Sequence, residues 1–198
     1  MGHGPRSLQR AARRRAPVAF WHFGRDHLVV AELSAGEDEP LLLACAAVRA
    51  EWVGAMRAGE ALSPGLLELH RRGVTGARIH AAALAADDDS AAADAVEIEE
   101  RGRRLRVSRA RIDHVVELFV AARLPLVALE HEASARDHLG RFFGPTGGKR
   151  AGDRSLADDP LAAVSVTPAC EPAAAALGSL LAVPVGLALA SFGVSEDA

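Results

Sequence analysis

The stretch of this chain that most invites a chemical interpretation is rich in glycine and contains a lysine: Gly144-Pro145-Thr146-Gly147-Gly148-Lys149-Arg150. Backbone N–H groups of such a stretch cradle phosphates when four residues separate a first Gly from the Gly-Lys pair and a Ser or Thr follows the Lys. Phe143 and Arg150 occupy those two positions here, and the stretch follows a predicted helix rather than a strand. The pattern therefore favours a mobile surface loop over residues 144–160.

Three other patterns bear on metal binding and nucleophilic catalysis. His131, Asp137 and His138 lack the two histidines at i and i+4 that a zinc-protease helix presents. The acidic run at residues 87–89 lacks the Gly and the distal Glu of a calcium loop. No serine lies in a Gly-x-Ser-x-Gly elbow. We therefore expect no catalytic residue, no metal site and no cofactor.

The two cysteines, Cys45 and Cys170, stand far apart in the sequence and form no CxxC pair. The basic N-terminus is not followed by the apolar region of a signal peptide. Two buried free thiols in a reducing compartment are the natural interpretation, and they favour the cytoplasm.

Charge is distributed unevenly over the 198 residues, although the net charge is only -3. A chain with this charge lacks the basic signature of a nucleic-acid-binding protein, so no nucleic acid partner is expected. Residues 1–16 nevertheless form a basic arm, which we interpret as a disordered tail. Contact with an anionic membrane surface is the alternative, because polybasic segments are attracted to lipid headgroups; it would run through Arg10, Arg13, Arg14 and Arg15.

A second segment raises the question of a membrane span. Residues 172–194 carry no charge and reach the length that a membrane helix requires. The segment is mostly Ala, Gly and Ser with a central Pro184, and its flanks are acidic or neutral. We expect a buried core helix plus a strand here, and a membrane anchor at residues 173–194 is the alternative.

The N-terminal half reads as a strand meander followed by a helix and a fourth strand. Polar turns with Gly, Asp or Pro separate the β-rich runs, which is a hairpin pattern. Ser63 and Pro64 open the helix and Gly73 closes it. The expected strands are residues 18–23, 28–33, 41–48 and 77–84.

The C-terminal half adds a hairpin at residues 96–107 and two helices around another strand. The first helix follows Ser108 and carries an apolar stripe at helical spacing, formed by Ile112, Val115, Val116, Phe119 and Val120. A strand at residues 124–129 and a helix at residues 132–143 follow, then a short strand at residues 161–166. This order predicts a mixed α/β fold in which helices flank one sheet, with residues 17–194 as a single domain.

The opening hairpin is similar to that of the PilM-like, actin-like proteins of type IV pilus assembly. In that family the first strand ends in Asp-x-Gly, and the second begins with Lys and closes on Glu-Leu. Gly24, Glu32 and Leu33 fit this pattern, whereas His22 stands in place of the Asp and Val29 in place of the Lys.

Further matches follow in the same order along the chain. They lie at residues 56–60 and 63–73, 77–84, 107–124, 129–135 and 185–192, the last containing Gly-Leu-Ala-Leu. Two departures accompany them: residues 85–106 are a shortened form of the family's inserted subdomain, and the second lobe with its own phosphate loop is missing. The chain thus resembles a single reduced lobe of the actin-like (ribonuclease H-like) fold, from a degenerate PilM-like protein of the HofM-type competence branch.

This resemblance implies a non-catalytic cytoplasmic scaffold, peripheral to the inner membrane, of a pilus or DNA-uptake complex. Its expected partner is the cytoplasmic tail of a PilN-like bitopic inner-membrane protein, bound by strand addition to an open sheet edge. The residues expected to form that site are Ile79, Ala81, Ala83, Ile98, Leu105 and Val107. Two alternatives remain open: a nucleotide-binding phosphotransferase completed by a partner chain, and a membrane-anchored structural protein.

The degenerate phosphate hairpin at His22, Gly24 and Val29 predicts that the protein neither binds nor hydrolyses Mg-ATP. An actin-like site needs two facing hairpins and carboxylates that hold hydrated Mg²⁺. Calorimetric titration should detect no binding. A dissociation constant below about 100 μM, equivalent to about -5.5 kcal/mol, would contradict this prediction.

Overall fold

The centre of the sheet is a hairpin of β1 (Val18–Phe23) and β2 (His27–Ser34), whose runs of β-branched, aromatic and aliphatic residues suit a strand covered on both faces. Every residue of β1 is buried, as is all of β2 except His27. The computed structural model describes residues 16–49, 63–85, 95–100, 103–143 and 159–193.

Four further strands extend this hairpin into a six-stranded mixed sheet of order β7-β4-β1-β2-β3-β8. β3 (Leu41–Arg49) runs antiparallel to β2, whereas β4 (His80–Leu84) runs parallel to β1 and β7 (Leu126–His131) runs parallel to β4. The short β8 (Ser165–Val166) pairs in parallel with β3. An antiparallel meander continued on its β1 side by two parallel strands is the ribonuclease H-like topology. The fold is therefore a single mixed α/β lobe of ribonuclease H-like topology.

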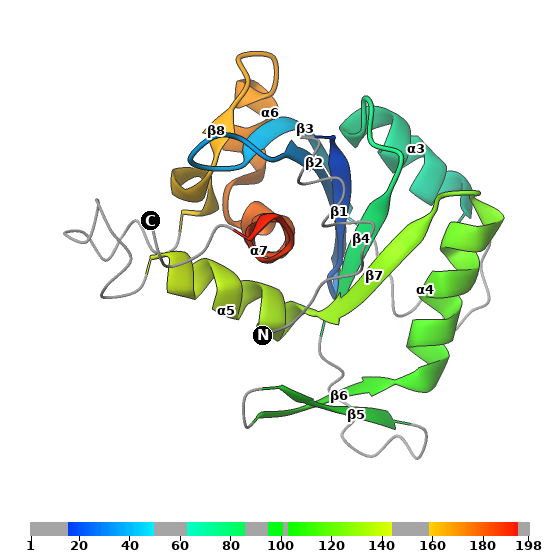
Figure 1. Ribbon diagram of the computed structural model, residues 1–198. Coiled ribbons are helices and arrows are strands. Elements are labelled where there is room, and N and C mark those ends of the chain that lie inside the picture. Colours follow the sequence, from blue (N-terminus) through cyan, green and yellow to red (C-terminus); the bar gives the residue numbers. More distant parts are fainter. Residues whose placement is uncertain (1–15, 50–62, 86–94, 101–102, 144–158, 194–198) are drawn as a thin grey trace.

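Helices cover both faces of the sheet (Figure 1). One face packs against α3 (Ser63–Gly73) and α4 (Arg109–Ala121). The other packs against α5 (Glu132–Phe142), α6 (Glu171–Leu177) and α7 (Ala182–Phe192). β5 (Ala95–Glu100) and β6 (Arg103–Ser108) form a separate antiparallel pair beside the N-terminal end of α4, which confirms the predicted hairpin (Figure 1).

The apolar stripe predicted for α4 is wrong in part. Val115 and Phe119 are buried as expected, but Val116 is 42% exposed and Val120 is 71% exposed. Arg111 and Leu118 are buried in their place. The row of residues 112, 116 and 120 lies about 100° around the helix from its buried row, because each residue turns the chain by that angle. The buried face is therefore centred on Val115 and Phe119, and two valines are left outside it.

The uncharged C-terminal segment is helical throughout and contains no strand, so the expected helix plus strand is wrong on that point. It consists of α6, η3 (Gly178–Leu181) and α7, and the predicted strand before it begins instead as η2 (Pro160–Ala163). By length and composition, Glu171–Phe192 qualifies as one candidate membrane span among the described residues, and 56% of its apolar 18-residue window is buried inside the fold. Leu187 and Leu189 are both buried, as predicted for a core element.

Close contact between α5 and α7 depends on a residue without a side chain. A Cβ atom at Gly186 would lie 1.9 Å from the carbonyl oxygen of Ala135 in α5. Glycine therefore lets the two helix backbones approach each other, while the opposite side of α7 packs on the sheet. This contact gives the Gly of the Gly-Leu-Ala-Leu match a structural role.

Glu32 has a comparable role in β2. Its carboxylate is completely buried and accepts hydrogen bonds from Thr75 Oγ1 at 2.8 Å, from the backbone N–H of Gly76 at 2.9 Å and from the backbone N–H of Thr75. The carboxylate thus ties the loop between α3 and β4 to the middle of the sheet. A buried charge is tolerated here because it has several donors.

We predict that Phe119→Ala lowers the free energy of unfolding by about 3–5 kcal/mol, because a fully buried aromatic ring is lost. The ring of Phe119 makes an edge-to-face contact with Trp21, with centroids 5.6 Å apart. Val120→Ala is the matched control on the exposed face and should change stability by less than about 0.5 kcal/mol. Equal effects of the two substitutions in denaturant unfolding would contradict the orientation of α4.

We also predict that Gly186→Ala destabilises the protein by about 1–3 kcal/mol or more, since α5 and α7 would have to separate. Gly140 lies in α5 with nothing within 4 Å of an added Cβ, so Gly140→Ala is the control. That substitution should stabilise the protein by about 0.5–1 kcal/mol through helix propensity alone. Thermal melts that shift in the same direction for both variants would show that the helices do not meet at Gly186.

Candidate functional site

The carboxyl ends of β1, β4 and β7 lie side by side, because these three strands are parallel neighbours in the sheet. Their register places His22 beside Ala83, and Leu84 beside His131. Polar residues follow β1 and β7 at this edge, which is where open α/β sheets commonly bind ligands. This edge also contains the hairpin predicted to be a degenerate phosphate site.

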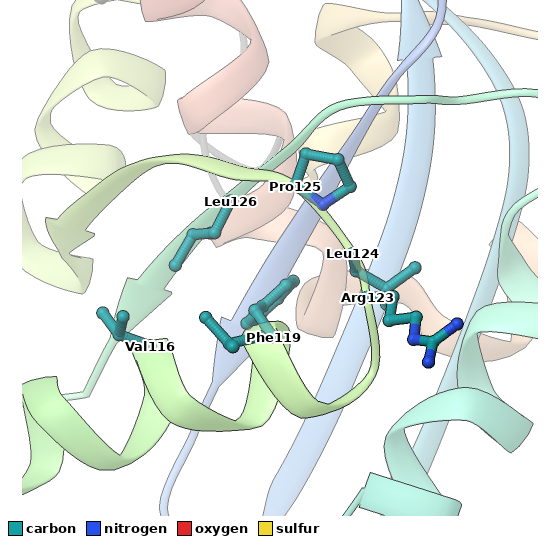
Figure 2. A pocket seen from close by; sticks show the side chains of 7 residues that line it. Val116, Phe119, Arg123, Leu124, Pro125 and Leu126 are labelled. Atoms are coloured by element: carbon teal, nitrogen blue, oxygen red, sulfur yellow. The ribbon is translucent and has the colours of Figure 1, made fainter.

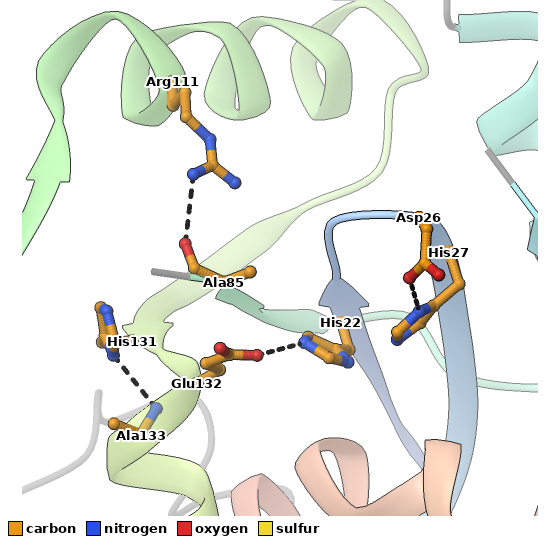
Figure 3. A network of polar contacts seen from close by, with 8 residues as sticks. All are labelled: His22, Asp26, His27, Ala85, Arg111, His131, Glu132 and Ala133. Atoms are coloured by element: carbon orange, nitrogen blue, oxygen red, sulfur yellow. Dashed lines mark hydrogen bonds and ion pairs between the residues drawn. The ribbon is translucent and has the colours of Figure 1, made fainter. Parts of the chain in front are cut away.

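The central interaction at this edge joins His22 of β1 to Glu132 at the start of α5. His22 Nε2 lies 2.9 Å from Glu132 Oε2, and the histidine is only 2% exposed (Figure 3). Burial lowers the pKa of His22 below its ordinary value, and the hydrogen bond to Glu132 opposes this effect without overcoming it. The neutral imidazole thus donates its Nε2 proton to the carboxylate, and Nδ1 is buried without a hydrogen-bond partner among the described residues.

The surrounding polar groups serve the local structure (Figure 3). His131 Nδ1 accepts the backbone N–H of Ala133 at 3.0 Å and so caps α5. Arg111 of α4 donates to the backbone carbonyl of Ala85 at 3.2 Å. Asp26 and His27 pair at 2.8 Å on the exposed turn, and this hydrogen bond lowers the pKa of Asp26. These contacts stabilise the start of α5, the end of β4 and the β1–β2 turn, which surround the His22–Glu132 pair.

The predicted phosphate hairpin forms, but its side chains are used within the fold. Val29 is completely buried in the core on the face of α7. The backbone N–H of Gly24 donates to the His27 carbonyl oxygen at 3.0 Å, which closes the turn. β1 contributes the imidazole of His22 at this edge, and the carboxylate bonded to it, that of Glu132, comes from the start of α5. Sequence reasoning matched residues 129–135 as a strand-to-helix junction and missed the role of Glu132 within it.

The residues of β4 that were predicted to bind a partner strand do not lie at an open edge of the six-stranded sheet, and this corrects their expected placement. β4 is paired with β1 on one side and with β7 on the other, so it offers no open edge. Ala81 and Ala83 are fully buried and Ile79 is partly buried. Val107 is buried in the core beneath α3 and α4.

The other two predicted partner-binding residues, Ile98 and Leu105, face each other as neighbours in the β5–β6 register. Their side chains lie outside the described residues, as do the acidic run at 87–89 and most of the shortened insert at 85–106. The basic arm through Arg15 and residues 144–158 of the predicted loop are outside them as well.

β7 and the two-residue β8 are the edge strands of the six-stranded sheet, and β7 pairs only with β4 among the described strands. Beside the start of β7 lies a hollow with a volume of about 390 Å³. Val116, Phe119 and Val120 of α4 form one wall, and the chain from Arg123 to Leu126 forms the other (Figure 2). The lining is predominantly apolar.

A second buried polar cluster lies on the α3 and α4 face. Trp21 Nε1 donates to His80 Nδ1 at 3.1 Å, and the ring of His70 stacks on the Trp21 ring with centroids 6.4 Å apart. Burial lowers the pKa of His80 to about 4, and it also lowers the pKa of His70. Neutral histidines therefore fill this part of the core.

The two cysteines are buried free thiols, as predicted from the sequence. Cys45 Sγ on β3 lies 3.5 Å from Cys170 Sγ at the start of α6. Burial raises the pKa of Cys45 to about 12 and also raises the pKa of Cys170. Neither thiol is suited to act as a nucleophile near neutral pH, since the thiolate is the reactive form.

His131, Asp137 and His138 do not form a metal site. Arg141 donates hydrogen bonds to His138 Nδ1 at 2.8 Å and to the Asp137 carbonyl oxygen at 3.0 Å. No group of three or more His, Cys, Asp or Glu side chains within the described residues is arranged to hold a metal ion.

Comparison with known proteins finds no matching family model and no matching curated protein. Among solved structures, the chain is similar to RuvC of Thermus thermophilus, with 16% sequence identity and a TM-score of 0.37. The match covers 90% of this chain and 97% of that chain. The fold assignment rests on the strand order and directions given above.

We predict that stability falls as the pH falls from about 7 towards 4. The pKa values of His22, His70 and His80 are lowered in the folded state, so the unfolded chain binds protons first below the ordinary value of 6.5. His22 and His80 each then remove up to about 1.4 kcal/mol per pH unit, and the less buried His70 removes less, because solvent screens its charge.

Urea unfolding at about pH 7.5 and about pH 5 measures this slope. His80→Gln keeps an acceptor for the Trp21 N–H, and it should reduce the slope because one buried titrating group is gone. A stability that is constant over this range, or that rises towards acid, would contradict the neutral state of the three rings.

Proposed function

We propose that this protein is a non-catalytic cytoplasmic scaffold, peripheral to the inner membrane, in a type IV pilus or DNA-uptake assembly complex. It holds the cytoplasmic tail of a PilN-like bitopic inner-membrane protein. The proposal is supported by the single-lobe fold and by the PilM-like motifs at residues 19–33, 129–135 and 185–192.

The observation that carries the proposal is the state of the carboxyl edge of the sheet. His22 is buried and neutral there and bonded to Glu132, and Val29 points into the core. A nucleotide site of the actin-like kind needs charged groups that are exposed to the phosphates and the metal. The residues present at this edge favour a structural role over a catalytic one.

A binding role is supported at the opposite end of the same strands. β7 is an edge strand of the sheet, and an incoming strand can pair with the backbone of such an edge. The apolar hollow beside it offers a place for a side chain. Because β4 is enclosed, strand addition would take place at β7 instead of at the residues expected from the sequence.

In this proposal two contacts keep the protein at the membrane. One is its binding to the bitopic partner. The other is the attraction between anionic lipid headgroups and the basic arm, which contains Arg10, Arg13, Arg14 and Arg15. The alternative of a membrane anchor at residues 173–194 would require α7 to leave the core, where eight consecutive residues from Ala182 to Leu189 are buried. Carbonate extraction of membranes distinguishes the two modes, since a peripheral protein is released and an anchored one is retained.

The test is a calorimetric titration of the full chain with a synthetic peptide, the cytoplasmic tail of a PilN-like bitopic protein from the same organism. We expect a dissociation constant of about 1–10 μM, or about -8 to -7 kcal/mol, and no heat with a scrambled peptide. If the tail does not bind while nucleotide raises the melting temperature, the phosphotransferase alternative replaces the scaffold.

A further inference from the structure

Four large hydrophobic residues are exposed among the described residues, namely Val48, Leu67, Val116 and Val120. Two of the four lie together on α4. Val116 and Val120, exposed by 42% and 71%, lie one turn apart on α4 and line the same hollow. These two valines therefore lie outside the core, beside the start of β7.

The same hollow ends at an arginine in an unusual backbone conformation. Arg123 has φ of 57°, the only positive value at a non-glycine residue among those described. It follows the end of α4, where its N–H donates to the Val120 carbonyl and the N–H of Leu124 donates to the Phe119 carbonyl. Glycine adopts this backbone conformation at a helix end without strain, whereas for Arg123 the same conformation is higher in energy.

The guanidinium of Arg123 forms no ion pair within the described residues. Figure 2 shows Val116 at one end of the hollow and Arg123 at the other, with Leu126 and Pro125 along the strand side. The surface therefore combines an apolar hollow, a cation at one end and the start of the edge strand β7.

We propose that this α4–β7 groove, formed by Val116, Phe119, Val120 and residues 123–126, binds an extended peptide that contains an apolar residue and an acidic residue. The peptide pairs with the free edge of β7, its apolar side chain enters the hollow between Val116 and Leu126, and its carboxylate pairs with Arg123. The inference rests on the proposed function and identifies where the partner tail binds and what chemistry it carries.

The dimensions of the groove set the spacing in the peptide. Val116 and Arg123 are seven residues apart on and just beyond a helix, or about 10 Å at a rise of about 1.5 Å per residue. An extended strand covers that distance in about three residues. The acidic residue should therefore stand about three residues from the apolar anchor, at the end of the peptide nearest the start of β7.

The test begins with random linear peptides displayed on phage and selected on the full-length protein. The expected consensus is an apolar residue and an acidic residue about three positions apart. The consensus peptide, amidated at its C-terminus, and its acid-to-amide counterpart are then titrated into wild-type protein and variants.

Val116→Ser with Val120→Ser should weaken binding of both peptides by about tenfold or more, because the apolar anchor loses its wall. Arg123→Gln should weaken the acidic peptide by about threefold to tenfold and leave the amide peptide unchanged. Leu67→Ser and Val48→Ser are matched controls at exposed apolar positions outside the groove, and they should bind like wild type. Hydrogen exchange of the β7 amides should slow when the peptide is bound.

The inference is overturned if no consensus emerges, or if the groove variants and the control variants bind the consensus peptide equally. The same variants are titrated with the partner tail to separate this inference from the proposed function. Tail binding that survives Val116→Ser with Val120→Ser rejects the groove and keeps the scaffold function. A protein that binds the consensus peptide in the groove but not the tail keeps the groove and rejects the partner.

Discussion

The rest of this structure depends on the packing of α7 between the sheet and α5. The central strand β1 is buried on both faces, and on one of them α7 supplies the cover. That arrangement requires α5 to lie directly over α7, and the missing side chain of Gly186 allows the backbone of α5 to approach it at Ala135. By its length and composition alone, the apolar segment that contains α7 could span a membrane. In this structure α7 lies between the sheet and α5 and forms the inner layer of the domain.

The position of α5 in turn determines the chemistry at the carboxyl edge. α5 begins immediately after β7, so its first residue, Glu132, is carried over the end of β1 to His22. The pairing fills the place where a charged, solvated group would be needed for phosphate or metal binding, and burial keeps the imidazole neutral. The opposite end of β7 has no such cover among the described residues, and there the sheet edge and the exposed valines of α4 remain accessible. At one end of the lobe the His22–Glu132 pair is enclosed by the fold, and at the other end lies the groove proposed to bind a peptide.

Much of this arrangement could be predicted from the sequence, because local patterns determine it. Alternation and turn residues predicted the β1–β2 hairpin and the β5–β6 hairpin, and helix spacing predicted α4 and α5 within a few residues. The order of strands across the sheet depends on long-range contacts, which is why β4 was expected at an edge and lies inside. The orientation of α4 was misjudged because Val116 and Val120 are as apolar as the residues that face the core. The His22–Glu132 pair joins residues 110 positions apart, and the left-handed conformation of Arg123 has no sequence signal when the residue is not glycine.

The central claim is that the lobe binds a partner segment along β7 and does not bind a ligand at its carboxyl edge. Hydrogen–deuterium exchange of the full chain, with and without the partner's cytoplasmic tail, tests it most directly because backbone protection reports where a strand has been added. The account predicts slower exchange confined to the end of α4 and to β7, over residues 116–131. Protection centred on the β1–β2 turn and the start of α5, with β7 unchanged, would contradict it.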